Sequence, residues 1–174
     1  MKKIIVLTLF AVASFSTLKA DDENISNFTS DQYAYLSLGG TANFVSLPGL
    51  YQLTIAPCVG VGFRAQSGHN GLDLSVQTRY VCDHFRIKGN SSYLYYFNPN
   101  LQDQIYCGIG AGIDTDIEMN GALLLTPELS IGKQFVTDAG RRRFWNVQFS
   151  PCAINRYGRV ITFSEVIVKY GFGF

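Results

Sequence analysis

Residues Val160 to Phe174 read VITFSEVIVKYGFGF and end the chain. Apart from Ser164, every second position of this stretch contributes to one largely apolar face: Val160, Thr162, Val166, Val168, Tyr170, Phe172 and Phe174. An alternation with a period of two predicts a β-strand with one apolar face. The stretch exceeds the usual length of a globular strand, and it is long enough to cross a bilayer, which takes about 9–11 tilted residues.

The same alternation occurs in seven earlier segments, which turn-forming sequences separate. The expected strands are residues 32–44, 51–65, 72–82, 83–97, 105–118, 123–135, 143–154 and, last, 160–174. Because the links between them are short, consecutive strands are expected to be antiparallel. The pattern predicts an all-β fold, an eight-stranded antiparallel up-and-down transmembrane β-barrel that spans residues 32–174.

The last strand resembles that of the small eight-stranded bacterial outer-membrane β-barrels, of the OmpA and OmpX type. In that class alternating aromatic residues lead to a terminal phenylalanine, and Tyr170, Phe172 and Phe174 match this ending. The resemblance covers residues 33–174 as an architecture. It implies that the barrel-insertion machinery reads these three residues as an insertion signature, and that outer-membrane lipids and lipopolysaccharide surround the protein.

The beginning of the chain has the features of an export signal. Lys2 and Lys3 precede a short apolar run, and small or polar residues follow up to Ala20. This order predicts a secretory signal peptide over residues 1–20, because the run is too short for a membrane-spanning helix. Residues 21–31 are acidic and lack periodicity, which indicates a flexible segment. We therefore expect an integral protein of the bacterial outer membrane after signal-peptide cleavage, and a monomer.

The charge balance excludes one class of partner. Residues 1–20 contain three of the 14 basic residues and none of the 13 acidic ones, so the mature chain carries 11 bases and 13 acids, a net charge of −2. Nucleic-acid-binding domains show a basic surface instead. We expect no nucleic-acid partner.

Three observations favour a barrel with its polar face inside. Glycines gather on the polar face, where a narrow lumen favours small residues; the apolar face is almost free of charge, with Lys133 as the exception near a strand end; and the polar face carries both signs of charge. The expected lumen charge network consists of Arg64, Asp73, Arg79, Arg86, Lys88, Asp114, Asp116, Glu118, Glu128, Glu165 and Lys169. The opposite orientation would give a soluble lipocalin-like binder of an apolar ligand.

Turn positions predict which charges lie opposite each other. If the turn at residues 67–71 is tight, the numbers of opposed residues sum to about 137, which places Arg64 opposite Asp73. A turn around Leu101 gives a sum of about 202. That sum places Arg86 opposite Asp116, Lys88 opposite Asp114, and His84 opposite Glu118. Opposite charges across a ladder contribute roughly 0.2–1 kcal/mol each.

An enzymatic alternative depends on one histidine. Lipid-modifying enzymes of the outer membrane need a histidine beside a carboxylate and a serine, because the histidine accepts a proton from the nucleophile. His84, with Asp83 or Glu118 and with Ser91 or Ser92, is the set on the outer side. It matches by residue type alone, so we expect no enzyme and no catalytic residue.

Other chemical sites are weaker still. Asp114-x-Asp116-x-Glu118 lacks the glycine and the final glutamate of an EF-hand loop. Arg156 and Arg159, in an expected outer loop, could meet lipopolysaccharide phosphates. Cys58 and Cys152 are expected to face inward and Cys82 and Cys107 outward, as free packing residues. We expect no cofactor and no metal.

The predicted function follows from these features. Tyr33, Tyr35 and Tyr106 join the charges on the inner face, so a packed lumen is expected. The sequence favours a small porin-like barrel with a structural or surface-interaction role in the cell envelope. The alternatives are a lipid-A-modifying enzyme, a narrow channel and a lipocalin-like binder.

Overall fold

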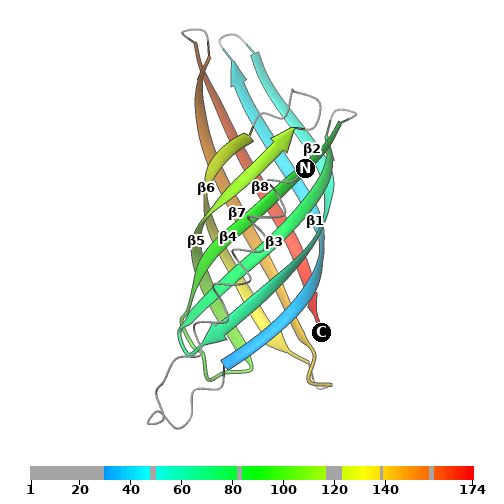
Figure 1. Ribbon diagram of the computed structural model, residues 1–174, viewed down its shortest axis with the longest axis vertical. Helices are drawn as coiled ribbons and strands as arrows, with labels where there is room; N and C mark the ends of the chain where they lie inside the picture. The colour runs from blue at the N-terminus through cyan, green and yellow to red at the C-terminus, as the bar shows by residue number, and fades with distance from the viewer. Residues whose placement is uncertain (1–29, 48–49, 82–83, 117–122, 138, 157–158) are drawn as a thin grey trace, which may run out of the picture.

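The fold is a single closed antiparallel β-barrel, with the eight strands in chain order around it (Figure 1). The computed structural model describes residues 30–47, 50–81, 84–116, 123–137, 139–156 and 159–174. The strands are β1 (Ser30–Leu47), β2 (Leu50–Ser67), β3 (Asn70–Val81), β4 (His84–Tyr96), β5 (Asp103–Asp116), β6 (Leu123–Val136), β7 (Arg142–Arg156) and β8 (Arg159–Gly173). The predicted fold class is confirmed.

The strands are tilted relative to the long axis of the barrel (Figure 1). The pairing register shows how far the strands are shifted along one another around the closed sheet. A path from partner to partner starts at Gln32 and passes through Ala65, Leu72, Tyr93, Ile109, Leu129, Phe149 and Val166 to Ala42. The path returns to β1 ten residues further along the strand. A closed sheet of eight strands needs such a shear, with strand tilts of about 35–45°, so that side chains fill its interior.

Tight turns close the end of the barrel that carries residue 174. Gly68 adopts a positive φ of 56° between β2 and β3, and Gly140 one of 73° between β6 and β7. Both positions favour glycine because a Cβ is disfavoured there. Residues 97–102, with Pro99, connect β4 to β5. We call the opposite end of the barrel, where β1, β3, β5 and β7 end at Leu47, Val81, Asp116 and Arg156, the outer end.

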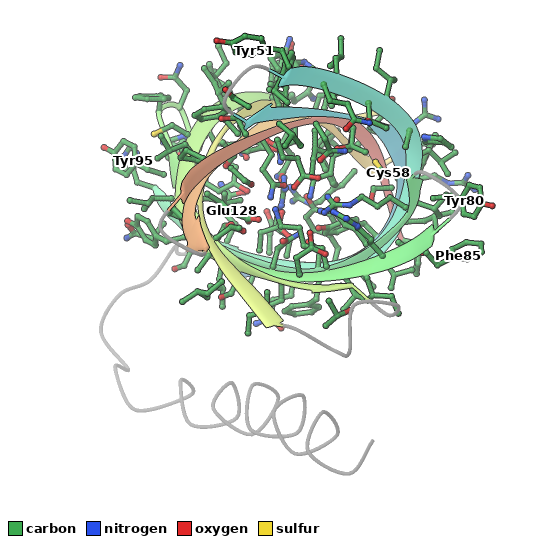
Figure 2. All side chains as sticks on the ribbon, turned by 90° about the horizontal axis from the view of Figure 1, so that it is seen from above. Tyr51, Cys58, Tyr80, Phe85, Tyr95 and Glu128 are labelled. Atoms are coloured by element: carbon green, nitrogen blue, oxygen red, sulfur yellow. The ribbon has the colours of Figure 1, made fainter. Side chains whose placement is uncertain are left out.

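The two faces of the wall differ in polarity. Nitrogen and oxygen atoms concentrate inside the ring, where Glu128 and Cys58 point, whereas Tyr51, Tyr80, Phe85 and Tyr95 point away from it (Figure 2). Large apolar side chains are exposed on all eight strands. Such a surface is stable in a bilayer and unstable in water. The barrel is a transmembrane β-barrel, and the lipocalin-like alternative is wrong because it requires the opposite orientation.

Aromatic side chains mark the two ends of this apolar belt. Tyr80 and Phe85 contact each other beside the outer link between β3 and β4, with ring centroids 4.9 Å apart. At the opposite end, Tyr95 and Phe97 contact each other, and so do Tyr170 and Phe172. Aromatic girdles at both membrane interfaces are typical of transmembrane barrels.

Strand boundaries differ from the expected ones by up to three residues. β1 begins at Ser30, within the segment expected to be flexible, because Asp31 pairs with Gln66 in the ladder and its carboxylate accepts a hydrogen bond from Arg142. Residues 1–29, with the expected signal peptide, lie outside the described residues. No helix in the described part of the chain is long and apolar enough to cross a membrane.

Candidate functional site: the packed lumen

The lower half of the lumen, which is the half nearer residue 174, is built around Arg64, whose side chain is fully buried. Asp73 lies directly opposite on β3, which confirms the predicted register, and the two side chains form an ion pair. The hydroxyl of Tyr35 also donates a hydrogen bond to this carboxylate, over 2.6 Å. The charges are thus removed from water but remain paired and hydrogen-bonded, which a buried ion pair needs in order to be tolerated.

Aromatic rings from distant strands surround the same guanidinium group. Its central carbon lies 4.0 Å from the ring centroid of Phe144 and 4.8 Å from that of Tyr106. These distances are in the range of cation–π contacts. The Phe144 ring packs edge-on against Tyr35, with centroids 4.8 Å apart. Arg64 therefore contacts side chains of β1, β3, β5 and β7 at one level of the barrel.

Gln134 completes this layer from β6. Its amide oxygen accepts hydrogen bonds from the hydroxyls of Tyr33 (2.6 Å) and Tyr96 (3.2 Å). Its amide nitrogen donates to Gln66 (3.1 Å) and Gln104 (3.2 Å). A fully connected polar layer of this kind specifies one packing arrangement.

A second charge cluster fills the outer half of the lumen. Arg79 forms ion pairs with Asp114 and Glu165. Lys88 Nζ lies 2.6 Å from Glu128 Oε1 and 2.9 Å from Glu165 Oε2. The Lys88 ammonium also donates a hydrogen bond to Ser150 Oγ over 2.9 Å. Two cations and three carboxylates from five strands therefore interlock across the barrel.

One predicted ion pair is wrong, although its register is right. Lys88 does lie opposite Asp114 in the β4–β5 ladder, as predicted. Its ammonium group instead contacts Glu128 and Glu165, while Arg79 bonds to Asp114. Inner side chains of a narrow barrel converge on the axis, so a long side chain reaches strands beyond its ladder neighbour.

The remaining predicted charges divide into two groups. Lys169 is buried and borders a cavity of about 10 Å³, which Asp73, Asn90, Asn146 and Gln148 also line. A space of this size holds about one water molecule. Arg86 lies opposite Asp116, as predicted, whereas Glu118 and the side chains of Asp116 and His84 lie outside the described residues. The structure therefore does not test the catalytic alternative at His84, and it describes the side chain of Asp114 but not the rest of the Asp114-x-Asp116-x-Glu118 motif.

The predicted insertion signature lies on the outer face of β8. The rings of Tyr170 and Phe172 pack edge to face, 4.9 Å apart, and Phe135 of β6 lies 6.3 Å from Tyr170. Phe174 is exposed, and its backbone N–H donates to the carbonyl of Ala34 over 3.0 Å. Lys133, the charge expected on the apolar face, lies 2.6 Å from Asp103 near the strand end.

Two cysteines and one histidine have described surroundings. Cys58 is buried in the lumen and Cys107 is exposed on the outer face, as predicted, and both are free. Cys82 and the side chain of Cys152 lie outside the described residues. His69 hydrogen-bonds the carbonyl of Tyr96 in the turn between β2 and β3. Among the described residues, no three His, Cys, Asp or Glu side chains are grouped to hold a metal ion.

Sequence reasoning missed two central lumen residues, Phe144 and Tyr96, which are both fully buried. Both positions follow the inward parity of their strands, so strict alternation would have found them. Their apolar rings concealed them, because the lumen was expected to be polar apart from a few tyrosines. The aromatic rings fill volume around Arg64 that polar side chains of ordinary size would leave empty.

No family model matches the chain, and no curated protein matches it. Among solved structures it is similar to Neisserial surface protein A (NspA), with 10% identity over 81% of this chain and 97% of that one, at a TM-score of 0.49. It is similar to Ail of Yersinia pestis, solved with the heparin analogue sucrose octasulfate, with 11% identity over 83% and 99% of the two chains, at a TM-score of 0.47. A de novo designed transmembrane β-barrel gives 11% identity over 80% and 95%, at a TM-score of 0.43. Likenesses at this level carry no functional inference.

Proposed function

We propose that this chain is a small integral protein of a bacterial outer membrane with a structural or surface-interaction role. The observation that carries the proposal is the reversed polarity of the barrel: large apolar side chains cover the outside, and ion pairs fill the inside. Lipids and lipopolysaccharide are the partners that such an outer face fits. The signal peptide expected over residues 1–20 would route the chain for export, and Tyr170, Phe172 and Phe174 would direct its insertion.

The packed lumen supports a role that does not depend on solute flow. The contacts of Arg64 with Phe144 and of Lys88 with Glu128 connect different walls of the barrel at two levels. The cavity in the lumen has room for about one water molecule. A lumen of this kind supplies rigidity. Function would then lie in the outer surface and in the links at the outer end.

The test is the gel mobility of the detergent-refolded mature chain, with and without boiling. We expect a heat-dependent shift, because a closed transmembrane barrel resists detergent until it is heated. In cells, the exported chain should sediment with the outer membrane in a density gradient. A chain that stays folded and monodisperse in water without detergent would overturn the proposal.

A further inference from the structure

The charged side chains of the lipid-facing wall gather in one place. Among the outward strand positions that the structure describes, three residues are charged: Asp103 on β5, Lys133 on β6 and Arg143 on β7. The three strands are neighbours, and all three residues lie near the end of the barrel that carries residue 174 (Figure 1). A charge on the lipid face of a barrel is costly at the bilayer midplane and nearly neutral at the interface. Their position therefore fits the level of the lipid headgroups.

Two of these charges cancel, and the third remains. Lys133 Nζ lies 2.6 Å from Asp103 Oδ2, so this pair carries no net charge. No described carboxylate forms an ion pair with Arg143. In the described part of the wall, Arg143 is thus the one lipid-facing charge that the chain does not neutralise.

A second arginine adds to the positive charge at the same place. Arg141 is exposed in the turn that leads into β7, and it too has no ion pair with a described carboxylate. The arginine between them, Arg142, is used within the barrel, because it pairs with Asp31. Asp138, in the same turn, lies outside the described residues. Arg141 and Arg143 are therefore the cations that can meet an anion from outside the chain.

Aromatic rings surround Arg143 in the wall. In the ladders it lies opposite Phe135 of β6 and opposite Phe172 of β8. Its guanidinium carbon is 5.9 Å from the ring centroid of Phe172. At the next outward position of β7, Trp145 is 40% exposed and lies opposite Tyr170. Because tryptophan and tyrosine rings concentrate at the headgroup level of a membrane, the Arg143 guanidinium lies where the apolar belt meets the headgroups.

This combination selects the ligand. A guanidinium group binds a phosphate through two parallel hydrogen bonds. The anions at the level of these rings are the phosphates of the surrounding lipids. A zwitterionic headgroup brings its own cation beside the phosphate, whereas an anionic headgroup balances the excess positive charge of the two arginines. We propose that Arg143, together with Arg141, forms a binding site for the phosphate group of an anionic phospholipid. The inference goes beyond the proposed function and rests on the membrane placement proposed there.

Trp145 makes the site measurable, because it is the single tryptophan of the chain and lies one outward position from Arg143. The mature chain is refolded into phosphatidylcholine vesicles in which part of the lipid carries bromine on its acyl chains, either as phosphatidylglycerol or as phosphatidylcholine. Bromine quenches tryptophan fluorescence on contact, so quenching against mole fraction gives the relative affinity of the two lipids. We expect brominated phosphatidylglycerol to bind about fivefold more strongly, the effect of one basic residue near an anionic lipid surface. Equal quenching by the two lipids would overturn the site.

Matched variants assign the preference to the arginines. Arg143→Gln with Arg141→Gln should abolish the preference for phosphatidylglycerol, and Arg143→Gln alone should weaken it. Lys133→Gln with Asp103→Asn removes two charges that already cancel, so it should keep the wild-type preference. A preference that survives in the arginine variants, or that disappears in the control, would show that these arginines do not hold the phosphate.

Two further measurements separate this site from a soluble anion and from the proposed function. Inorganic phosphate, added at constant ionic strength, should leave the quenching by brominated phosphatidylglycerol unchanged; a loss of the preference would identify a soluble phosphate as the ligand and contradict the lipid assignment. A chain folded by the gel-shift criterion whose Trp145 is quenched by neither brominated lipid would contradict the membrane placement. Quenching to the same degree by both lipids contradicts this site alone.

Discussion

Among single residues, Arg64 shows how a charge is accommodated inside a narrow barrel. Its guanidinium group is fully buried, paired with Asp73 and enclosed by the rings of Phe144 and Tyr106. Breaking a buried ion pair by removing one partner costs about 3–5 kcal/mol, because the other charge stays buried without compensation. We expect Arg64→Met to lower the free energy of unfolding in lipid vesicles by about that amount, as measured by urea titration.

Two matched variants separate the ion pair from general packing. Lys133→Met removes a partly exposed ion pair with Asp103 and should change stability by no more than about 1 kcal/mol. Arg64→Met combined with Asp73→Asn should be less destabilised than Arg64→Met alone, since no uncompensated charge remains. A double variant that is less stable than the single one would contradict this account.

Gly132 tests how closely the inner wall is packed. A Cβ at this inward position would collide with the backbone carbonyl of Trp145 and with the Tyr106 ring. At Gly89, on the outer face, a Cβ would meet nothing within 4 Å. Gly132→Val should therefore abolish the heat-dependent gel shift of the refolded chain, and Gly89→Val should keep it. Equal folded fractions for the two variants would contradict the packed lumen.

Among the strands, β8 closes the barrel by pairing with β1, and it also carries the proposed insertion signature. Phe174 is exposed and makes one backbone hydrogen bond to β1, so the folded barrel needs little from its side chain. We expect Phe174→Ala to refold in detergent with an unchanged heat-dependent shift, while its amount in the outer membrane of cells falls severalfold. Leu125→Ala, at another exposed apolar position, serves as the control. Equal cellular amounts would contradict the insertion signature.

The strands were predictable because one physical rule, alternation, governs both faces. The tight turn at Gly68 also fixed the β2–β3 register, so the opposition of Arg64 and Asp73 followed from the sequence. Contacts across the lumen were not predictable in this way. Lys88 reaches Glu128 and Glu165 because barrel closure brings β4, β6 and β8 around one axis, and no short-range pattern encodes which strands converge there.

The end of the β6–β7 ladder at Leu129–Phe149, beyond which both strands continue, was missed for a related reason. Pro127 and Pro151 each interrupt an otherwise regular strand pattern, and each is tolerated within its own hairpin. Their effect arises only because the register of β6 and β7 sets them opposite each other. Neighbouring strands in the barrel therefore determine the consequence of a residue that sequence reading treats as a local defect.

For the whole molecule, the two layers of side chains predict an electrically silent barrel. The Arg64 layer closes the lumen with aromatic rings, and the Lys88–Glu128–Glu165 cluster closes it with interlocked charges. In planar lipid bilayers the wild-type protein should give no unit conductance steps. Removing the rings that flank Arg64, by Phe144→Ala with Tyr106→Ala, opens only the lower layer and should leave the barrel silent.

Adding Lys88→Ala, Glu128→Ala and Glu165→Ala to those two changes truncates large side chains in both layers at once, which should open a path for water and ions. We expect discrete steps from the fivefold variant, provided that its heat-dependent gel shift shows a folded barrel. The threefold variant without the ring changes is the matched control and should stay silent, because Arg64 and its aromatic neighbours still fill the lower lumen. Steps from the wild-type protein would contradict the packed lumen and favour the narrow-channel alternative, since ions would then pass both layers.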